Sequence, residues 1–130
     1  MEKINITKFF ESINYNWQND LDYIKEIALI TKTRIDENKH TEMPYGIEQT
    51  FLIKSIAKNI KANNFYEIGS GRGTASFAVS LEKSINSVYS FDKFPRFIKQ
   101  ETAINYRPAR VSLNNIKDLI PFTEKTKIKF

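Results

Sequence analysis

Cysteine is absent from this chain of 130 residues, histidine occurs once, and glycine and proline occur only four times each. The absence of cysteine excludes a disulfide framework, a thiolate nucleophile and a zinc site with cysteine ligands. No apolar run approaches the roughly 20 residues that a membrane-spanning helix needs, and residues 1–10 lack the apolar centre of a signal peptide. We therefore expect one cytoplasmic domain with no membrane partner and no metal.

Positive charge is in excess but is not concentrated in any segment. The net charge is +5 and the isoelectric point is about 9.4, which raises the question of a nucleic-acid partner. The lysines are spread from Lys3 to Lys129 and alternate with acidic residues, as on an ordinary solvated surface. A nucleic acid is therefore a partner that the sequence permits but does not favour.

The spacing of apolar residues predicts an α/β fold in which helices precede alternating strands and helices. Helices are expected over residues 7–15, 19–38, 47–60, 74–83 and 95–105, with one helical turn over 116–120. Strands are expected over residues 65–68, 87–91, 110–113 and 126–130. Strands separated by helices imply crossover connections and a parallel sheet. We divide the chain into an N-terminal helical segment, residues 1–42, and a sheet domain, residues 43–130.

A glycine-rich loop is the most informative motif in the chain. Gly69, Gly71 and Gly73 stand at alternate positions directly after a predicted strand, and Glu67 precedes the first of them by two positions. Gly69 and Gly71 let the main chain turn tightly and approach a ligand, while Gly73 permits close packing of the following helix. A strand, a glycine turn and a helix N-terminus form a nucleotide-binding corner. A structural turn without a ligand is the alternative.

Asp92 is the second element of the candidate site. It follows the predicted strand over residues 87–91, and neighbouring parallel strands end at the same edge of a sheet, so Asp92 should lie beside the glycine loop. A carboxylate in that place can accept hydrogen bonds from both hydroxyls of a ribose. Taken alone, Asp92 could instead cap the helix expected to begin near Pro95. The loop and the distant acid together are more specific than either one.

Glu67, Gly69, Gly71 and Gly73 resemble the first motif of class I S-adenosylmethionine-dependent methyltransferases, an acid followed by glycines at alternate positions. Their spacing differs from the G-x-G-x-x-G of dinucleotide-binding proteins, and no Gly-Lys-Ser/Thr of a P-loop follows. Residues 43–52 are similar to the loop and helix before the first strand of small-molecule O-methyltransferases. Residues 88–92 are similar to the family's second motif, and residues 111–115 to its third-strand segment.

The resemblance covers residues 43–130 and implies a Rossmann-like parallel sheet of three to four strands in the order 3-2-1-4. It also implies S-adenosylmethionine as the cofactor, with the methionine portion beside the loop, the ribose on Asp92 and the adenine edge at Asn115. Glu67 is expected to fix the loop or to hold the methionyl amino group through water. The full candidate cofactor set is Glu67, Gly69, Ser70, Gly71, Gly73, Asp92, Lys93 and Asn115.

The chain departs from the family because it ends where the fourth strand is predicted, so the resemblance implies the cofactor-binding half of a methyltransferase. An open sheet edge invites pairing, and we expect a homo-oligomer or a partner chain that completes the sheet. The expected function is methyl transfer to a small molecule, with the catalytic base unassigned among His40, Glu42, Tyr45 and Glu48. The alternatives are a non-catalytic S-adenosylmethionine-binding or protein-interaction module and, from net charge alone, a nucleic-acid methyltransferase.

Overall fold

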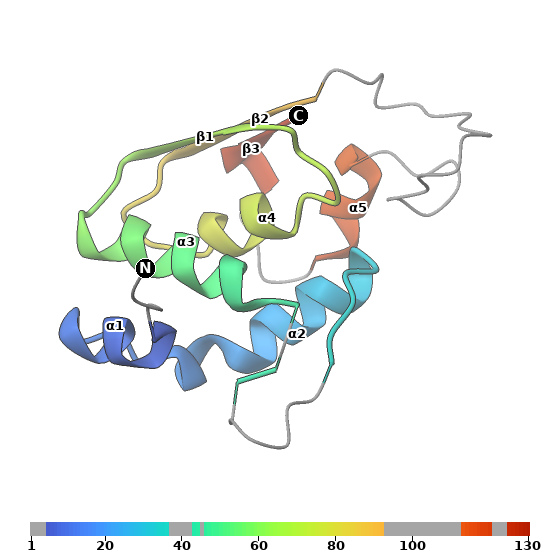
Figure 1. The fold of residues 1–130 in the computed structure, drawn as a ribbon. Coiled ribbons are helices and arrows are strands. Elements are labelled where there is room, and N and C mark those ends of the chain that lie inside the picture. The colour runs from blue at the N-terminus through green and yellow to red at the C-terminus, as the bar shows by residue number, and fades with distance from the viewer. Residues whose placement is uncertain (1–4, 37–42, 45, 93–112, 121–124) are drawn as a thin grey trace.

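In the described part of the chain, three short parallel strands form a sheet, and helices pack against one side of it (Figure 1). The structure is a computed structural model that describes residues 5–36, 43, 44, 46–92, 113–120 and 125–130. The elements in chain order are α1 (Ile6–Ser12), the 3₁₀ helix η1 (Trp17–Asp20), α2 (Leu21–Ile30), α3 (Glu48–Asn59), β1 (Asn64–Ile68), α4 (Thr74–Ser80), β2 (Ser87–Phe91), α5 (Leu113–Leu119), the 3₁₀ helix η2 (Lys125–Lys127) and β3 (Ile128–Lys129). The fold is therefore α/β with a parallel sheet, as the sequence predicts.

The strand order is β1-β2-β3, and both neighbouring pairs are parallel. β1 and β2 pair along their whole length, up to Ile68 beside Phe91, so the two strands end together. β3 pairs with β2 through Ile128, whereas we expected residues 126–130 to form a fourth strand beside β1. They take the place next to β2 because Ile128 and Phe130 bury their side chains there, with the Phe130 ring 5.3 Å from the ring of Phe77.

Most of the other predicted elements are present within a few residues of their expected ranges. This applies to α1, α3, α4, α5, β1 and β2. The strand expected over residues 110–113 is not confirmed, because residues 110–112 lie outside the described part and Leu113 begins α5. The helix expected over residues 95–105 also lies outside the described residues. Within the described ranges, no helix has the length and apolar character needed to cross a membrane.

Two of the helices end in a left-handed turn made by lysine instead of glycine. After α2, the Thr33 amide donates to the Ala28 carbonyl oxygen (2.8 Å) around Lys32, whose φ is +57°. Lys61, with a φ of +51°, closes α3 in the same way. Glycine is the usual residue at this position because it has no Cβ. The turn at Lys32 ends α2 at Ile30, which corrects the helix that we expected to continue to residue 38.

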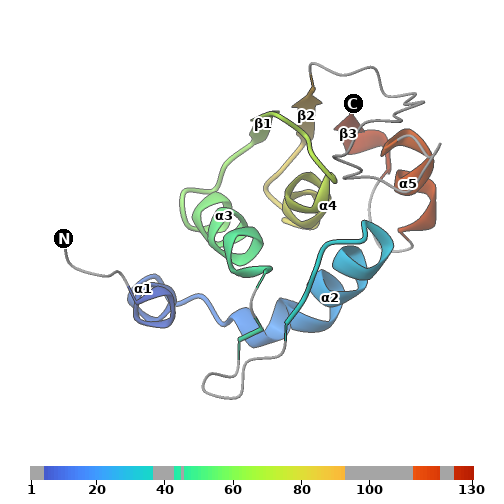
Figure 2. The same cartoon turned by 45° about the vertical axis from the view of Figure 1, so that its right-hand side comes forward.

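One hydrophobic core contains side chains from the N-terminal helices and from the sheet layer. Trp17 of η1 packs edge-on against Phe51 of α3, with ring centroids 5.7 Å apart. Phe77 of α4 and Val88 of β2 are fully buried in the same cluster. Figure 2 shows the arrangement: α3 and α4 lie directly beneath the strands, and α1 and α2 pack beyond them. The N-terminal helices and the sheet domain therefore share one core.

A buried lysine connects three helices inside this assembly. The Lys54 ammonium of α3 lies 2.9 Å from the Asp20 carboxylate and 3.2 Å from the Glu82 carboxylate, which follows α4. The Tyr15 hydroxyl donates a hydrogen bond to the same Asp20 oxygen (2.7 Å). Burial, together with the hydrogen bond and the charge of Asp20, raises the pKa of Tyr15 well above its usual range. The pair of carboxylates compensates the buried charge of Lys54.

The side of the sheet that faces away from α3 and α4 carries exposed apolar side chains. Tyr66 is 64% exposed, Ile68 is 93% exposed and Phe91 is 52% exposed. The Tyr66 ring stacks on Tyr89 at 5.1 Å, and the Lys129 ammonium lies 5.1 Å from the centre of the Tyr89 ring. Among the described strands, none pairs with the outer edge of β1. Within the described residues, this edge of β1 therefore has no neighbouring strand.

Candidate functional site

The glycine loop lies between the end of β1 and the start of α4, where the sequence predicts it. Gly69, Gly71 and Gly73 have φ angles of +87°, +49° and +77°. These conformations are strained for a residue with a Cβ, which explains the alternating glycines. Among the described residues beyond its chain neighbours, a Cβ at Gly69 would have no atom within 4 Å, and one at Gly71 would meet only the Gly69 carbonyl oxygen at 4.0 Å. Open space therefore borders the backbone of the loop.

Glu67 connects the loop to the two elements beside it. Its side chain points from β1 to the helix side of the sheet, where one carboxylate oxygen accepts hydrogen bonds from Ser76 (2.6 Å) and Ser90 (2.7 Å). The Ser90 hydroxyl is also hydrogen-bonded to the Ser70 hydroxyl (2.7 Å), and all three serines are buried. Of the two roles expected for Glu67, this geometry favours fixing the loop. Sequence analysis did not single out Ser76 and Ser90.

Asp92 lies beside the loop, as the sequence predicts. Its Oδ2 accepts a hydrogen bond from the Gly71 amide at 3.3 Å. The two groups meet because β1 and β2 are paired through Ile68 and Phe91, so the residues that follow leave the sheet at the same edge. A half-buried carboxylate is therefore held next to the open space over the loop.

Four backbone amides of the loop are used within the protein. The amides of Gly69 and Ser70 both donate to the Phe91 carbonyl oxygen (2.7 and 3.1 Å), and the Gly73 amide donates to the Ser70 carbonyl oxygen (2.7 Å). The amide between them donates to Asp92. A loop that binds phosphate directs such amides at the ligand instead. These four amides therefore have partners within the protein.

The residues of the loop fit the cofactor that the resemblance implies. S-adenosylmethionine carries a ribose, for which Asp92 offers a carboxylate acceptor, and it carries no phosphate, which agrees with the engaged amides. Among the described residues, the space next to Gly69 and Gly71 holds no side chain that would block a ligand. The carboxylate of Asp92 thus suits the ribose part of an adenosyl group.

A cluster of threonine hydroxyls, which sequence analysis missed, lies directly behind the loop. Thr74 is the first residue of α4, and its hydroxyl oxygen lies 2.8 Å from that of Thr31 and 2.6 Å from that of Thr33. Thr31 ends α2 and is fully buried. These contacts join residues more than 40 positions apart, so local spacing gives no signal for them.

The structure places Asn115 differently from the sequence prediction. The third-strand segment expected over residues 111–115 is wrong where the structure describes it, because residues 113–115 lie in α5. Ile116 and Ile120 are buried at a spacing of four, the period of a helix and not of a strand. The expected contact of Asn115 with adenine depended on that third strand, so the structure gives it no support. Lys93, the other candidate beyond Asp92, lies outside the described residues.

The candidates for a catalytic base fall mostly in the part of the chain that the structure does not describe. His40, Glu42 and Tyr45 lie outside the described residues. The Glu48 carboxylate accepts a hydrogen bond from the Gly46 amide (2.6 Å), so it caps the turn before α3. Among the described residues, no group of three acidic or histidine side chains is placed to hold a metal ion.

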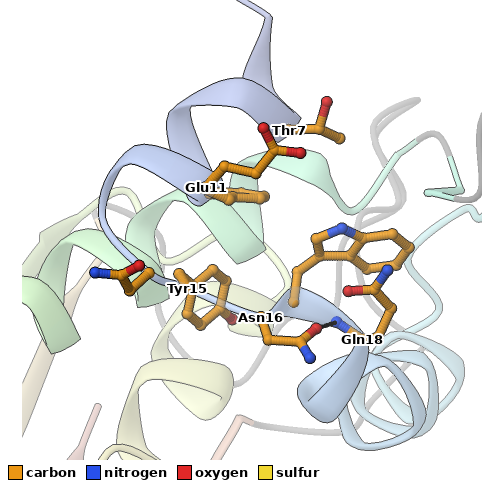
Figure 3. A pocket seen from close by; sticks show the side chains of 8 residues that line it. Thr7, Glu11, Tyr15, Asn16 and Gln18 are labelled. Atoms are coloured by element: carbon orange, nitrogen blue, oxygen red, sulfur yellow. Dashed lines mark hydrogen bonds between the residues drawn. The ribbon is translucent and has the colours of Figure 1, made fainter.

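A groove of about 460 Å³ lies at α1 and η1, apart from the loop. Its floor is formed by aromatic rings that are almost completely buried, and its rim is polar (Figure 3). Figure 3 shows Glu11 and Thr7 on one side and Asn16 with Gln18 on the other. The Asn16 side chain accepts a hydrogen bond from the Gln18 backbone amide (3.2 Å) and so caps η1. Since α1 packs on α3 and α3 packs on α4, α3 separates the groove from the loop.

Comparisons with protein families, with curated protein sequences and with solved structures find no match to this chain.

Proposed function

We propose that this chain binds S-adenosylmethionine at the glycine loop and transfers its methyl group to a small molecule. The observation that carries the proposal is the Asp92 carboxylate at the end of β2, 3.3 Å from the Gly71 amide and next to the open space over the loop. The engaged loop amides favour this cofactor over ATP or a dinucleotide, whose phosphates need free donors. The motif around Glu67 supports the family, and the geometry of the loop supports the ligand class.

The residues of the chain would act by holding the cofactor in place. The bound cofactor supplies an electrophilic methyl group on a sulfonium. Gly69 and Gly71 let the backbone approach the ligand, and Asp92 accepts hydrogen bonds from the ribose hydroxyls. Glu67 keeps the loop in register with β2 and α4 through its serine partners. Methyl transfer depends mainly on alignment of the nucleophile with the methyl group, and a loop fixed to two strand ends is suited to that task.

Calorimetric titration against a panel of ligands tests the proposal. We expect S-adenosylmethionine and S-adenosylhomocysteine to bind in the micromolar range, and ATP and NAD⁺ not to bind. Binding of ATP or NAD⁺ in preference to S-adenosylmethionine would contradict the argument from the loop amides. Formation of S-adenosylhomocysteine with candidate acceptors then separates an enzyme from a non-catalytic binding module. RNA affinity that falls steeply with salt would favour the nucleic-acid alternative.

We also propose that the sheet pairs with a second copy of this chain. The exposed side chains of Tyr66, Ile68 and Phe91 and the open edge of β1 support association. Size-exclusion chromatography with light scattering should give twice the mass of the chain, and Ile68→Asp should give the single mass. A single mass for the unmodified chain at high micromolar concentration would refute self-association.

A further inference from the structure

The threonine cluster behind the glycine loop contains no spare hydroxyl proton. Thr31 donates its proton to the Ile27 carbonyl oxygen (2.8 Å) at the end of α2. Within the cluster Thr31 can therefore only accept, and Thr33 and Thr74 supply the two remaining protons. The three hydroxyl oxygens lie between 2.6 and 3.1 Å apart. These two protons can bridge only two of the three contacts, and in every arrangement Thr74 takes part in at least one of them, so the first residue of α4 is hydrogen-bonded to the segment that ends α2.

This set of bonds is connected directly to the loop. Thr74 follows Gly73, whose left-handed backbone forms the N-cap of α4 without a side-chain cap. The Gly73 amide bonds back to the Ser70 carbonyl oxygen, and Ser70 in turn bonds to Phe91 at the end of β2. A displacement of Thr74 would therefore be transmitted to the backbone that borders the open space. Among the described residues, the three hydroxyls contact one another and the carbonyl oxygens of α2, so neutral hydrogen bonds hold the junction.

We propose that Thr31 and Thr33 are positioning residues for the cofactor loop, so that docking of α2 and binding at the loop are energetically linked. The part concerning the cofactor rests on the proposed function, whereas the effect on loop conformation does not. Linkage is reciprocal, so a ligand at the loop must stabilise the end of α2 by the amount that the end of α2 stabilises the loop. A purely local structural role would produce no such effect.

Hydrogen exchange measured with and without S-adenosylmethionine tests the proposal. In the unmodified chain we expect the ligand to slow exchange of the Thr31 and Thr33 amides, which lie on a different element from the loop. In Thr31→Val/Thr33→Val, loop amides 70–75 should exchange about tenfold faster, and the cofactor Kd should rise about tenfold, the factor that about 1.4 kcal/mol represents. Thr31→Ser/Thr33→Ser keeps both hydroxyls and should restore both values.

Ser80→Ala is the matched control, because among the described residues the buried Ser80 hydroxyl bonds only to the Phe77 carbonyl oxygen within α4 (2.6 Å). It should lower the stability of the helix without changing loop exchange or affinity.

Unchanged loop exchange in the double valine variant would overturn the inference, whether or not the cofactor binds. If the unmodified chain does not bind S-adenosylmethionine, the proposed function fails, and faster loop exchange in the valine variant would still support the positioning role. If the valine variant does not fold, the protection of the Thr31 and Thr33 amides in the unmodified chain decides the question.

Discussion

Replacement of Lys54 by methionine is the perturbation whose effect the structure predicts most directly. The Lys54 side chain is 5% exposed and forms ion pairs with Asp20, which is 19% exposed, and Glu82, which is 14% exposed. Methionine keeps most of the aliphatic stem and removes the charge. The variant therefore leaves two mostly buried carboxylates without their shared cation.

Removing one partner of a buried ion pair costs about 3–5 kcal/mol. Because water still reaches Asp20 and Glu82 in part, we place the loss at the lower end, about 3 kcal/mol. For a domain of this size that loss lowers Tm by roughly 10–15 °C. Urea unfolding followed by circular dichroism measures the free energy, and calorimetry measures Tm.

A second substitution tests the reason for the loss. Asp20→Asn in the Lys54→Met background removes one unpaired charge and keeps an acceptor for the Tyr15 hydroxyl. We expect it to recover at least about 1 kcal/mol, although the same change in the unmodified chain is destabilising. A loss below about 0.5 kcal/mol for Lys54→Met, or additive losses in the double variant, would refute the account of the cluster.

Three further predictions follow from the backbone and from Tyr15. Gly69→Ala should fold with a loss of about 1–2 kcal/mol from its φ of +87°, yet lose cofactor binding in calorimetry because the new Cβ projects into the open space. Lys61→Gly should raise the free energy of unfolding by about 0.5–1 kcal/mol, because the Lys61 backbone is in the left-handed conformation that glycine adopts without strain. Asn59→Gly, in the last turn of α3, should lower it. The raised pKa of Tyr15 means that the folded chain keeps a proton which the unfolded chain releases near pH 10. Stability in urea should therefore fall as the pH rises above about 10, and the fall should be shallower in Tyr15→Phe.

Local patterns in the sequence predict the elements and the loop well. The limits of β2 agree with the prediction because Val88 and the apolar residues beside it alternate between the two faces of a strand. The glycine loop could be predicted because alternating glycines have few other uses, and the register of β1 and β2 then brings Asp92 to it. These features depend on residues close together in the chain or on one rule of sheet geometry.

The features that sequence analysis missed depend on contacts between distant segments. The position of β3 is decided by what Ile128 and Phe130 bury, and the same alternation would suit either edge of the sheet. The early end of α2 carries no glycine signal because Lys32 takes the left-handed conformation. The threonine cluster joins α2 to α4 through neutral side chains that are common on any helix.

Titration of the unmodified chain and of two aspartate variants with S-adenosylmethionine tests the central claim most directly. Asp92→Asn removes the carboxylate beside the loop, and Asp22→Asn removes an exposed carboxylate on α2 as the matched control. A hydrogen bond to a charged group contributes about 1.5–3 kcal/mol, so we expect Asp92→Asn to weaken binding roughly 10- to 100-fold and Asp22→Asn to leave it unchanged. Equal affinity in all three chains, or no binding by the unmodified chain, would contradict the assignment of the glycine loop and Asp92 as a cofactor site.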